Sequence, residues 1–214
     1  MSGTEEYHMN DRPGEENLSR QQLKSRHTKE KIFQAAKQIL QTEGYEALSI
    51  KNICEKAGVS NGSFYHHFQT KDDLLSYYIE DQPSINPDLL AVPADLKEVR
   101  ETIISVYLNY VAYCRDLGVT FIANYYTPKN QALNPETRTK RPYPITTVRS
   151  YLEKAMEAGV LPQHLNLEEI TTDIRMLVIG NVFEWSMRNG EPDFEGNVRR
   201  SIGTYLDGVL DGKD

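Results

Sequence analysis

Side chains able to recognise nucleic acid gather between residues 49 and 71 of this 214-residue chain. Hydroxyl, amide, imidazole and ammonium groups follow one another there at short intervals. Such groups form hydrogen bonds with phosphate oxygens and with the edges of base pairs. The sequence contains no glycine-rich phosphate loop, no His-Glu-x-x-His run and no nucleophile elbow. We therefore expect a DNA-binding protein and not an enzyme, with neither a metal nor a cofactor.

The residues of this segment fall into two groups, those suited to base edges and those suited to phosphates. Lys51 can donate to guanine, and Asn61 can pair with adenine through two hydrogen bonds. Gly62 has no side chain and allows the backbone to come close to the DNA. His66 can reach a base or a phosphate. Hydroxyl, phenol, imidazole and ammonium groups, together with the backbone donors of a helix start, suit phosphate. The phosphate-facing set is Ser49, Ser60, Ser63, Tyr65, His67 and Lys71.

Two short helices joined by a tight turn would position these side chains. Ala57 is small enough for the helices to cross closely, and Gly58 can adopt the left-handed conformation that ends the first helix. Val59 fills the angle between the helices, and Ser60 caps the second helix. This arrangement projects the first residues of the second helix into the major groove. Phe64 and Phe68, four residues apart on that helix, are expected to face the core.

This stretch closely resembles the DNA-binding domain of the TetR family of bacterial regulators. The resemblance covers about residues 28 to 80 and rests on Ala-Gly-Val-Ser at 57–60, Phe-Tyr-His-His-Phe at 64–68 and Lys-Asp-Asp-Leu-Leu at 71–75. Cys54 departs from the Ala that the family more often has, and Ser63 replaces a common Thr. The resemblance implies a C-terminal domain that binds a small molecule and forms a dimer.

The distribution of charge fits this interpretation. The whole chain carries −7, but nine Lys or Arg and four Glu between Arg20 and Lys71 give that segment +5, which leaves −12 for the remainder. A basic headpiece on an acidic body presents one face to phosphate. No apolar run is long enough to span a bilayer, and no signal pattern opens the chain, so we expect a cytoplasmic protein without a membrane partner. Cys54 and Cys114 are too few for a disulfide framework or a zinc site.

Helical periodicity recurs along the whole chain, and no strand alternation is found. The predicted fold is all-α: a three-helix helix-turn-helix headpiece plus a larger helical ligand-binding and dimerisation domain. We expect a flexible arm over 1–27, the DNA-binding domain over 28–80 and the larger domain over 81–214. Thr28, Ser49 and Thr70 are the expected caps of the first, second and fourth helices, and Asp73 is placed to complete a capping box with Thr70. The predicted helices span about 28–44, 49–58, 60–68, 70–80, 94–117, 119–126, 145–158, 167–188 and 194–210, with a long loop or lid over 127–144.

The last two predicted helices are candidates for a dimer interface. An apolar stripe recurs at intervals of four, three and four residues, and glycines at 180 and 203 would let helices approach closely. Two such helices from each subunit would form a four-helix bundle about a two-fold axis. The alternative is that the stripe packs within its own subunit. The predicted interface consists of Gly180, Val198, Ile202, Tyr205 and Val209.

The middle of the chain is rich in tyrosine, which suits a pocket for a flat or amphipathic compound. Polar residues among apolar neighbours could orient such a ligand. The predicted ligand residues are Tyr107, Tyr110, Tyr125, Arg175, Asn181 and Trp185. We expect a homodimeric repressor that binds double-stranded DNA at a palindromic operator and is released by a small-molecule effector. The alternative is a DNA-binding regulator controlled by a protein partner, or an architectural DNA-binding factor.

Overall fold

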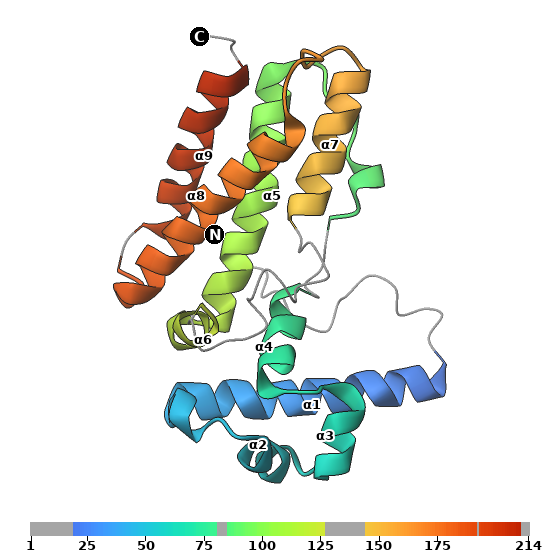
Figure 1. Cartoon of the computed structure of the whole chain (residues 1–214), viewed down its shortest axis with the longest axis vertical. Coiled ribbons are helices and arrows are strands. Elements are labelled where there is room, and N and C mark those ends of the chain that lie inside the picture. Colours follow the sequence, from blue (N-terminus) through green and yellow to red (C-terminus); the bar gives the residue numbers. More distant parts are fainter. Residues whose placement is uncertain (1–18, 81–84, 127–143, 192, 211–214) are drawn as a thin grey trace, which may run out of the picture.

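The computed structural model describes residues 19–80, 85–126, 144–191 and 193–210. Over these ranges every regular element is helical, which confirms the all-α prediction. Four helices form a lower unit and five form an upper bundle (Figure 1). The α-helices are α1 (Arg20–Thr42), α2 (Ile50–Ala57), α3 (Asn61–His67), α4 (Lys71–Glu80), α5 (Leu96–Leu117), α6 (Val119–Tyr125), α7 (Ile145–Glu157), α8 (Leu167–Met187) and α9 (Phe194–Leu210).

The first helix begins earlier than the sequence predicted. Thr28 does not cap it, because α1 already starts at Arg20. Ser19 and Gln22 form a capping box, in which the Ser19 hydroxyl accepts the Gln22 N–H at 3.2 Å and Gln22 Oε1 accepts the Ser19 N–H at 2.8 Å. The Thr28 hydroxyl instead donates to the Lys24 carbonyl one turn before it. Residues 20–27, expected in a flexible arm, are therefore helical, and residues 1–18 lie outside the described ranges.

The helix-turn-helix forms as its cap residues predict. The Ser49 hydroxyl accepts the Asn52 N–H, and the Ser60 hydroxyl accepts the Ser63 N–H, each at 3.1 Å. Gly58 ends α2 in the left-handed conformation at φ +66°, where a side chain would be strained. The angle between α2 and α3 is therefore set locally, by the backbone conformation of Gly58 and by the two caps.

The fourth helix carries the predicted capping box. Thr70 Oγ1 accepts the Asp73 N–H at 3.0 Å, and Asp73 Oδ2 accepts the Thr70 N–H at 3.1 Å. A short 3-10 turn, Pro87–Leu89, occupies the expected connector between α4 and α5. Thr147 Oγ1 and Lys154 Nζ on α7 hold this connector by donating to the carbonyls of Ile85 and Pro87.

The upper bundle is built around α5, which packs against α9 and α7, while α8 packs against α9, α7 and α6. Asp95 caps α5 by accepting the Glu98 N–H at 2.8 Å, so the helix begins at Leu96 and not at Ala94. The predicted loop or lid over 127–144 falls almost wholly outside the described residues. None of the described helices is long and apolar enough to cross a membrane.

The lower unit and the bundle share a packed junction between α1 and α6. The rings of Phe33 and Phe121 meet edge to face with centroids 5.7 Å apart, and both side chains are fully buried. Beside them, Lys37 Nζ donates to the Asp116 carbonyl at 3.0 Å, near the end of α5. Burial lowers the pKa of Lys37, an effect that the charges of Asp116 and Glu30 oppose. The closest described packing between the headpiece and the body is therefore at α1 and α6.

Candidate nucleic-acid interface

The recognition helix α3 has a buried side and an exposed side. Phe64 is fully buried and Phe68 is 4% exposed, and their rings pack with centroids 5.7 Å apart. Both were predicted to lie in the core, and this is confirmed. On the opposite side the Tyr65 ring is 58% exposed, and Asn61 and Gly62 are also exposed. Because the two phenylalanines fix the rotation of α3, its first turn points into solvent, as a base-reading role requires.

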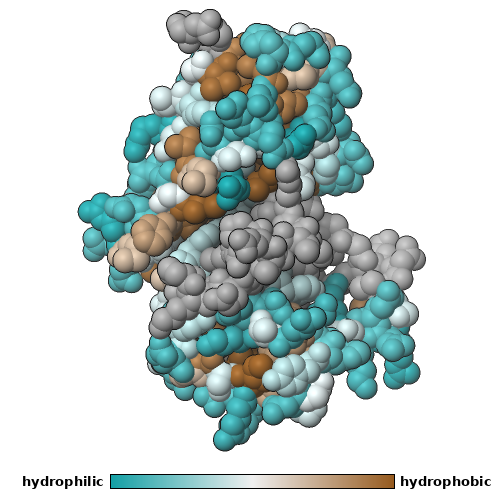
Figure 2. Space-filling model, viewed as in Figure 1, coloured by the Kyte–Doolittle hydropathy of each residue, from teal (hydrophilic) through white to brown (hydrophobic). Residues whose placement is uncertain are grey.

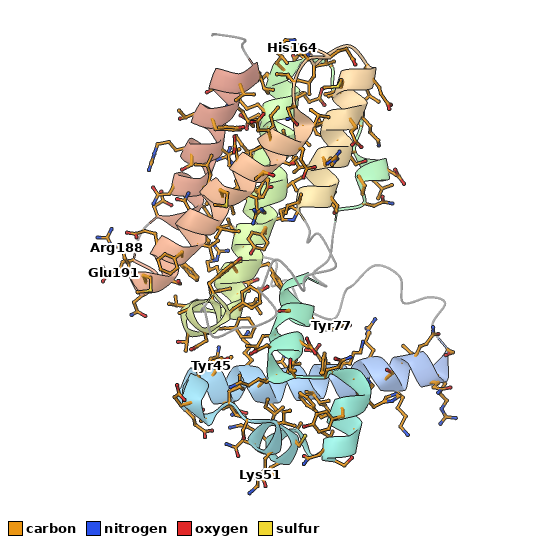
Figure 3. All side chains as sticks on the ribbon, in the orientation of Figure 1. Tyr45, Lys51, Tyr77, His164, Arg188 and Glu191 are labelled. Atoms are coloured by element: carbon orange, nitrogen blue, oxygen red, sulfur yellow. The ribbon has the colours of Figure 1, made fainter. Side chains whose placement is uncertain are left out.

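Lys51 projects from α2 at the outer edge of the lower unit (Figure 3). Its side chain is 78% exposed, and its ammonium lies 4.0 Å from the Glu55 carboxylate. An exposed pair at this distance contributes little to stability, so Lys51 is available to another partner. The Ser49 and Ser60 hydroxyls accept backbone N–H groups at the starts of α2 and α3, which leaves their own protons free to be donated to phosphate.

Lys71 lies inside a small cluster that the sequence did not reveal. Its ammonium donates to the Leu48 carbonyl at 3.1 Å and lies 4.2 Å from the centre of the Tyr45 ring. The Tyr45 hydroxyl in turn donates to Asp72 Oδ1 at 3.1 Å. Burial, reinforced by Asp72, raises the pKa of Tyr45 to about 12. Lys71 therefore braces the segment before α2 against α4. Tyr45 was missed because nothing in its local pattern indicates a contact 27 residues away.

The two adjacent histidines differ in exposure. His66 is exposed, His67 is half-buried, and their ring centroids are 4.9 Å apart. Burial, followed by the charges of His66 and Lys29, lowers the pKa of His67, which favours the neutral imidazole at physiological pH. The neutral His67 imidazole is thus suited to donate one hydrogen bond to a phosphate oxygen. Within the described ranges, no group of three or more His, Cys, Asp or Glu side chains could hold a metal ion.

The predicted ligand tyrosines lie on the inner faces of α5 and α6. Tyr107 and Tyr125 are 1% exposed and Tyr110 is 6% exposed. The Tyr110 and Tyr126 hydroxyls share a hydrogen bond of 2.7 Å. Burial raises the pKa of Tyr110 far above its ordinary value, with Cys114 and Tyr126 adding to the effect. The Tyr110 phenol therefore stays protonated and offers an uncharged hydrogen-bonding group in apolar surroundings.

The remaining predicted ligand residues lie on α8, and two of them have structural contacts. Asn181 Nδ2 donates to the Leu177 carbonyl and to Ser201 Oγ on α9, at 2.8 and 3.3 Å. The Trp185 ring stacks on Phe194 with centroids 4.7 Å apart, at the turn between α8 and α9. Arg175 is half-buried on α8. Their described contacts therefore tie α8 to α9 and do not connect Asn181 or Trp185 to the tyrosine cluster.

The predicted dimer interface needs correction on α9. Val198 and Ile202 are fully buried within the single chain, where α9 packs against α5 and α8, so they are core residues and cannot touch a partner. Gly203, expected at a helix-helix approach, lies against Arg100, which binds Asp207 at 2.6 Å. The alternative of packing within the subunit holds for these positions. Tyr205 and Val209 are half-buried.

The exposed apolar surface lies instead on α8. Met176, Phe183 and Met187 are 60%, 49% and 64% exposed, and with Gly180 they follow one another at intervals of four, three and four residues. We call these four residues the α8 stripe; a band of hydrophobic surface follows this helix (Figure 2). Beside it a shallow groove of about 520 Å³ is lined by Gly180, Asn181 and Tyr205, among others. Of the stripe, only Gly180 was predicted to lie at the interface, because α8 is apolar on both faces.

Comparison with known sequences supports the same family. Residues 32–78 match the family model for bacterial regulatory proteins of the tetR family. The chain is 32% identical over 101 residues to the transposon Tn10 TetC protein of Escherichia coli. The aligned stretch covers 47% of this chain and 51% of TetC. The chain thus spans about half the length of that relative. It is also 22% identical over 200 residues to the transcriptional regulator TtgR of Pseudomonas putida, covering 89% of this chain and 95% of TtgR.

Comparison with solved structures extends the likeness to the whole fold. TylP of Streptomyces fradiae, a tetr regulator, superposes with a TM-score of 0.56 at 20% identity, covering 85% of each chain. FadR of Bacillus subtilis, solved in complex with stearoyl-CoA, has a TM-score of 0.54 at 18% identity and covers 86% of this chain and 99% of its own. A helix-turn-helix headpiece joined to a helical body is therefore the fold they share. Over residues 32–78 the chain therefore carries the helix-turn-helix domain described by the family model for bacterial regulatory proteins of the tetR family.

Proposed function

We propose that this chain is a ligand-responsive transcriptional repressor that binds a palindromic operator as a homodimer and is released by a small molecule. The observation that carries the proposal is the exposed tip of α3 (Asn61, Gly62 and Tyr65) beside exposed Lys51, on a headpiece whose core holds that tip outward. A single recognition helix reads few base pairs, so two headpieces at a fixed spacing are needed for a specific site. Residues 28–80 form the DNA-binding domain in this proposal, and 81–214 the regulatory domain.

A second copy of the chain is the proposed occupant of the α8 stripe. Its apolar residues are spaced to form one face of a helix, and Gly180 allows a partner helix to approach closely. Tyr205 on α9 lines the groove beside the stripe, and half-buried Val209 follows four residues later on the same helix. Pairing α8 and α9 with their copies gives a four-helix bundle about a two-fold axis.

The effector would act on the body near the buried tyrosines. Tyr107, Tyr110 and Tyr125 supply an apolar wall with neutral hydrogen-bonding groups. The stearoyl-CoA bound to Bacillus subtilis FadR supports a ligand in a body of this fold, and its chemistry is not carried over to this chain. A ligand that favours one headpiece separation over another changes operator affinity by about 5- to 150-fold, for a coupling of about 1 to 3 kcal/mol.

Selection of bound duplexes from a random pool tests the proposal. The purified protein should enrich a palindromic site with half-sites about one helical turn apart. A compound screen against that complex would then identify the effector. Failure to enrich any sequence would favour an architectural DNA-binding factor, and a regulator that responds to a protein partner would be indicated if the body had no ligand cavity.

Asn61→Ala is expected to relax the preference at one base step of each half-site. The amide reads a base edge, and its loss reduces discrimination at that position by about 1 to 3 kcal/mol. Affinities for the selected site and for its single-base variants, measured by fluorescence anisotropy, check this result. Tyr65→Phe is the matched control on the same helix. It removes a phosphate-facing hydroxyl and should weaken binding to every duplex equally; an equal loss on all duplexes for Asn61→Ala would refute the base-reading role.

The Phe33–Phe121 contact is expected to couple the headpiece to the body. Phe33→Leu and Phe121→Leu should be non-additive, with an interaction free energy of about 0.5 to 1.5 kcal/mol, because an edge-to-face pair stabilises beyond its buried area. Chemical denaturation of both single variants and the double variant measures it. Phe33→Leu combined with Leu210→Ala is the control. Leu210 lies beside Leu96 at the start of α5, at the end of the bundle away from the headpiece (Figure 1), and this pair should be additive.

A further inference from the structure

Three cationic side chains and a histidine lie along one face of the first turns of α1. Arg20, Lys24, His27 and Lys31 follow at intervals of four, three and four residues, which places them on the same side of a helix. We call this row the α1 ridge. All four side chains are exposed, and none forms an ion pair within the described part of the chain.

The helix holds these charges at fixed positions. The Ser19–Gln22 capping box secures the first turn, and the other end of α1 is anchored by buried Ile32, Phe33 and Ile39 in the headpiece core. At a rise of about 1.5 Å per residue the ridge is about 16 Å long. A rigid row loses little conformational entropy on binding, whereas a flexible basic arm would have to be ordered.

The ridge continues into a polar groove between α1 and α2. The groove has a volume of about 650 Å³, and its lining includes His27 and Lys31 of the ridge, Lys56 of α2 and the neutral amide of Gln38. Its nearest acidic group, Glu30, is engaged by Gln34 Nε2 at 2.7 Å. The described lining of the groove has three lysines, Lys31, Lys37 and Lys56, and one carboxylate, Glu30, and Lys56 also pairs with Glu43 at 3.4 Å. The groove is therefore cationic on balance, which suits a phosphate backbone.

The direction of α1 determines which phosphates the ridge meets. Its first turns extend beyond α3, on the side of the headpiece away from α8 and α9 (Figure 1). In a dimer joined through α8 and α9, the two ridges point away from the two-fold axis. We propose that the α1 ridge is a second DNA-contact surface, which binds backbone phosphates flanking the outer end of each operator half-site. This inference rests on the proposed function.

The test compares the selected operator duplex with the same duplex shortened by about six base pairs at each end, within the reach of a 16 Å ridge. The ridge variant is Arg20→Gln, Lys24→Gln and Lys31→Gln. Wild-type protein should bind the longer duplex more tightly, and its affinity for that duplex should fall more steeply with salt. In the ridge variant the gain from the flanks should disappear, and the salt slope on the longer duplex should fall by about 2 to 3 per subunit.

A charge-matched control removes three exposed cations from the body: Lys97→Gln, Arg115→Gln and Arg200→Gln. It should behave like wild type on both duplexes. A ridge variant that equals wild type on the longer duplex would overturn the inference, and so would an equal loss on both lengths, which would place the contact inside the half-site. Either outcome leaves the proposed function intact, whereas wild-type protein that enriches no sequence overturns both.

Discussion

Replacing Phe183 and Met187 with Asp is expected to separate the dimer into monomers and to lower operator affinity by about 10³-fold or more. The two side chains form half of the α8 stripe and are 49% and 64% exposed in the single chain. Burying two carboxylates in an apolar interface is strongly unfavourable. A monomer reads one half-site, so its affinity falls towards that of non-specific binding, which is at least about 10³-fold weaker.

Sedimentation equilibrium and binding to the selected operator measure these two effects. The control variant carries Leu89→Asp and Val92→Asp. These side chains are 81% and 60% exposed on the connector before α5, at a distance from α8 and α9 (Figure 1). This variant should remain dimeric and bind the operator as wild type does. A dimeric Phe183/Met187 variant would show that the α8 stripe is not the interface.

Phe64→Ala is expected to destabilise the headpiece by about 3 to 5 kcal/mol. The ring is fully buried, packs on Phe68 and sets the rotation of α3. A loss of this size is a large part of the stability of a domain, so operator binding should be abolished. The body has its own core around α5, α8 and α9, and it should stay folded and dimeric.

Circular dichroism on heating should resolve an early transition for the headpiece of this variant, while sedimentation still reports a dimer. Tyr65→Ala provides the control one residue along the same helix. Because its ring is 58% exposed, its loss should change stability by no more than about 0.5 kcal/mol even though DNA binding weakens. A Phe64→Ala protein that melts as wild type does would contradict the packing described for α3.

The sequence predicted best those features that depend on interactions between residues close together in the chain. The caps at Ser49, Ser60 and Thr70 and the stop at Gly58 were predicted correctly, because each depends on residues within four positions. The start of α1 was wrong for a related reason. The Ser19–Gln22 capping box is equally local, but no apolar period follows it before Thr28, so the helix start was predicted at Thr28.

The surfaces of the body could not be predicted in this way. The apolar stripe of α9 has the same period whether it faces its own core or a partner, and only the packing of α9 against α5 and α8 assigned Val198 and Ile202 to the core. The α8 stripe was missed because α8 has apolar residues on both faces, so its sequence does not show which face is buried and which is exposed. The Tyr45–Lys71 cluster joins residues whose proximity depends on tertiary packing.

The sequence by itself determined the helix-turn-helix, its core residues Phe64 and Phe68, and the set of side chains able to meet DNA. These features follow from caps, a left-handed glycine and helical spacing, which operate over a single turn. Tertiary structure decided which apolar stripe stays exposed, that α1 packs against α6 of the body, and where the cations of α1 point. Those properties depend on which helices pack together. The local sequence pattern shows which residues share a face of a helix, but it does not show which other helix packs against that face.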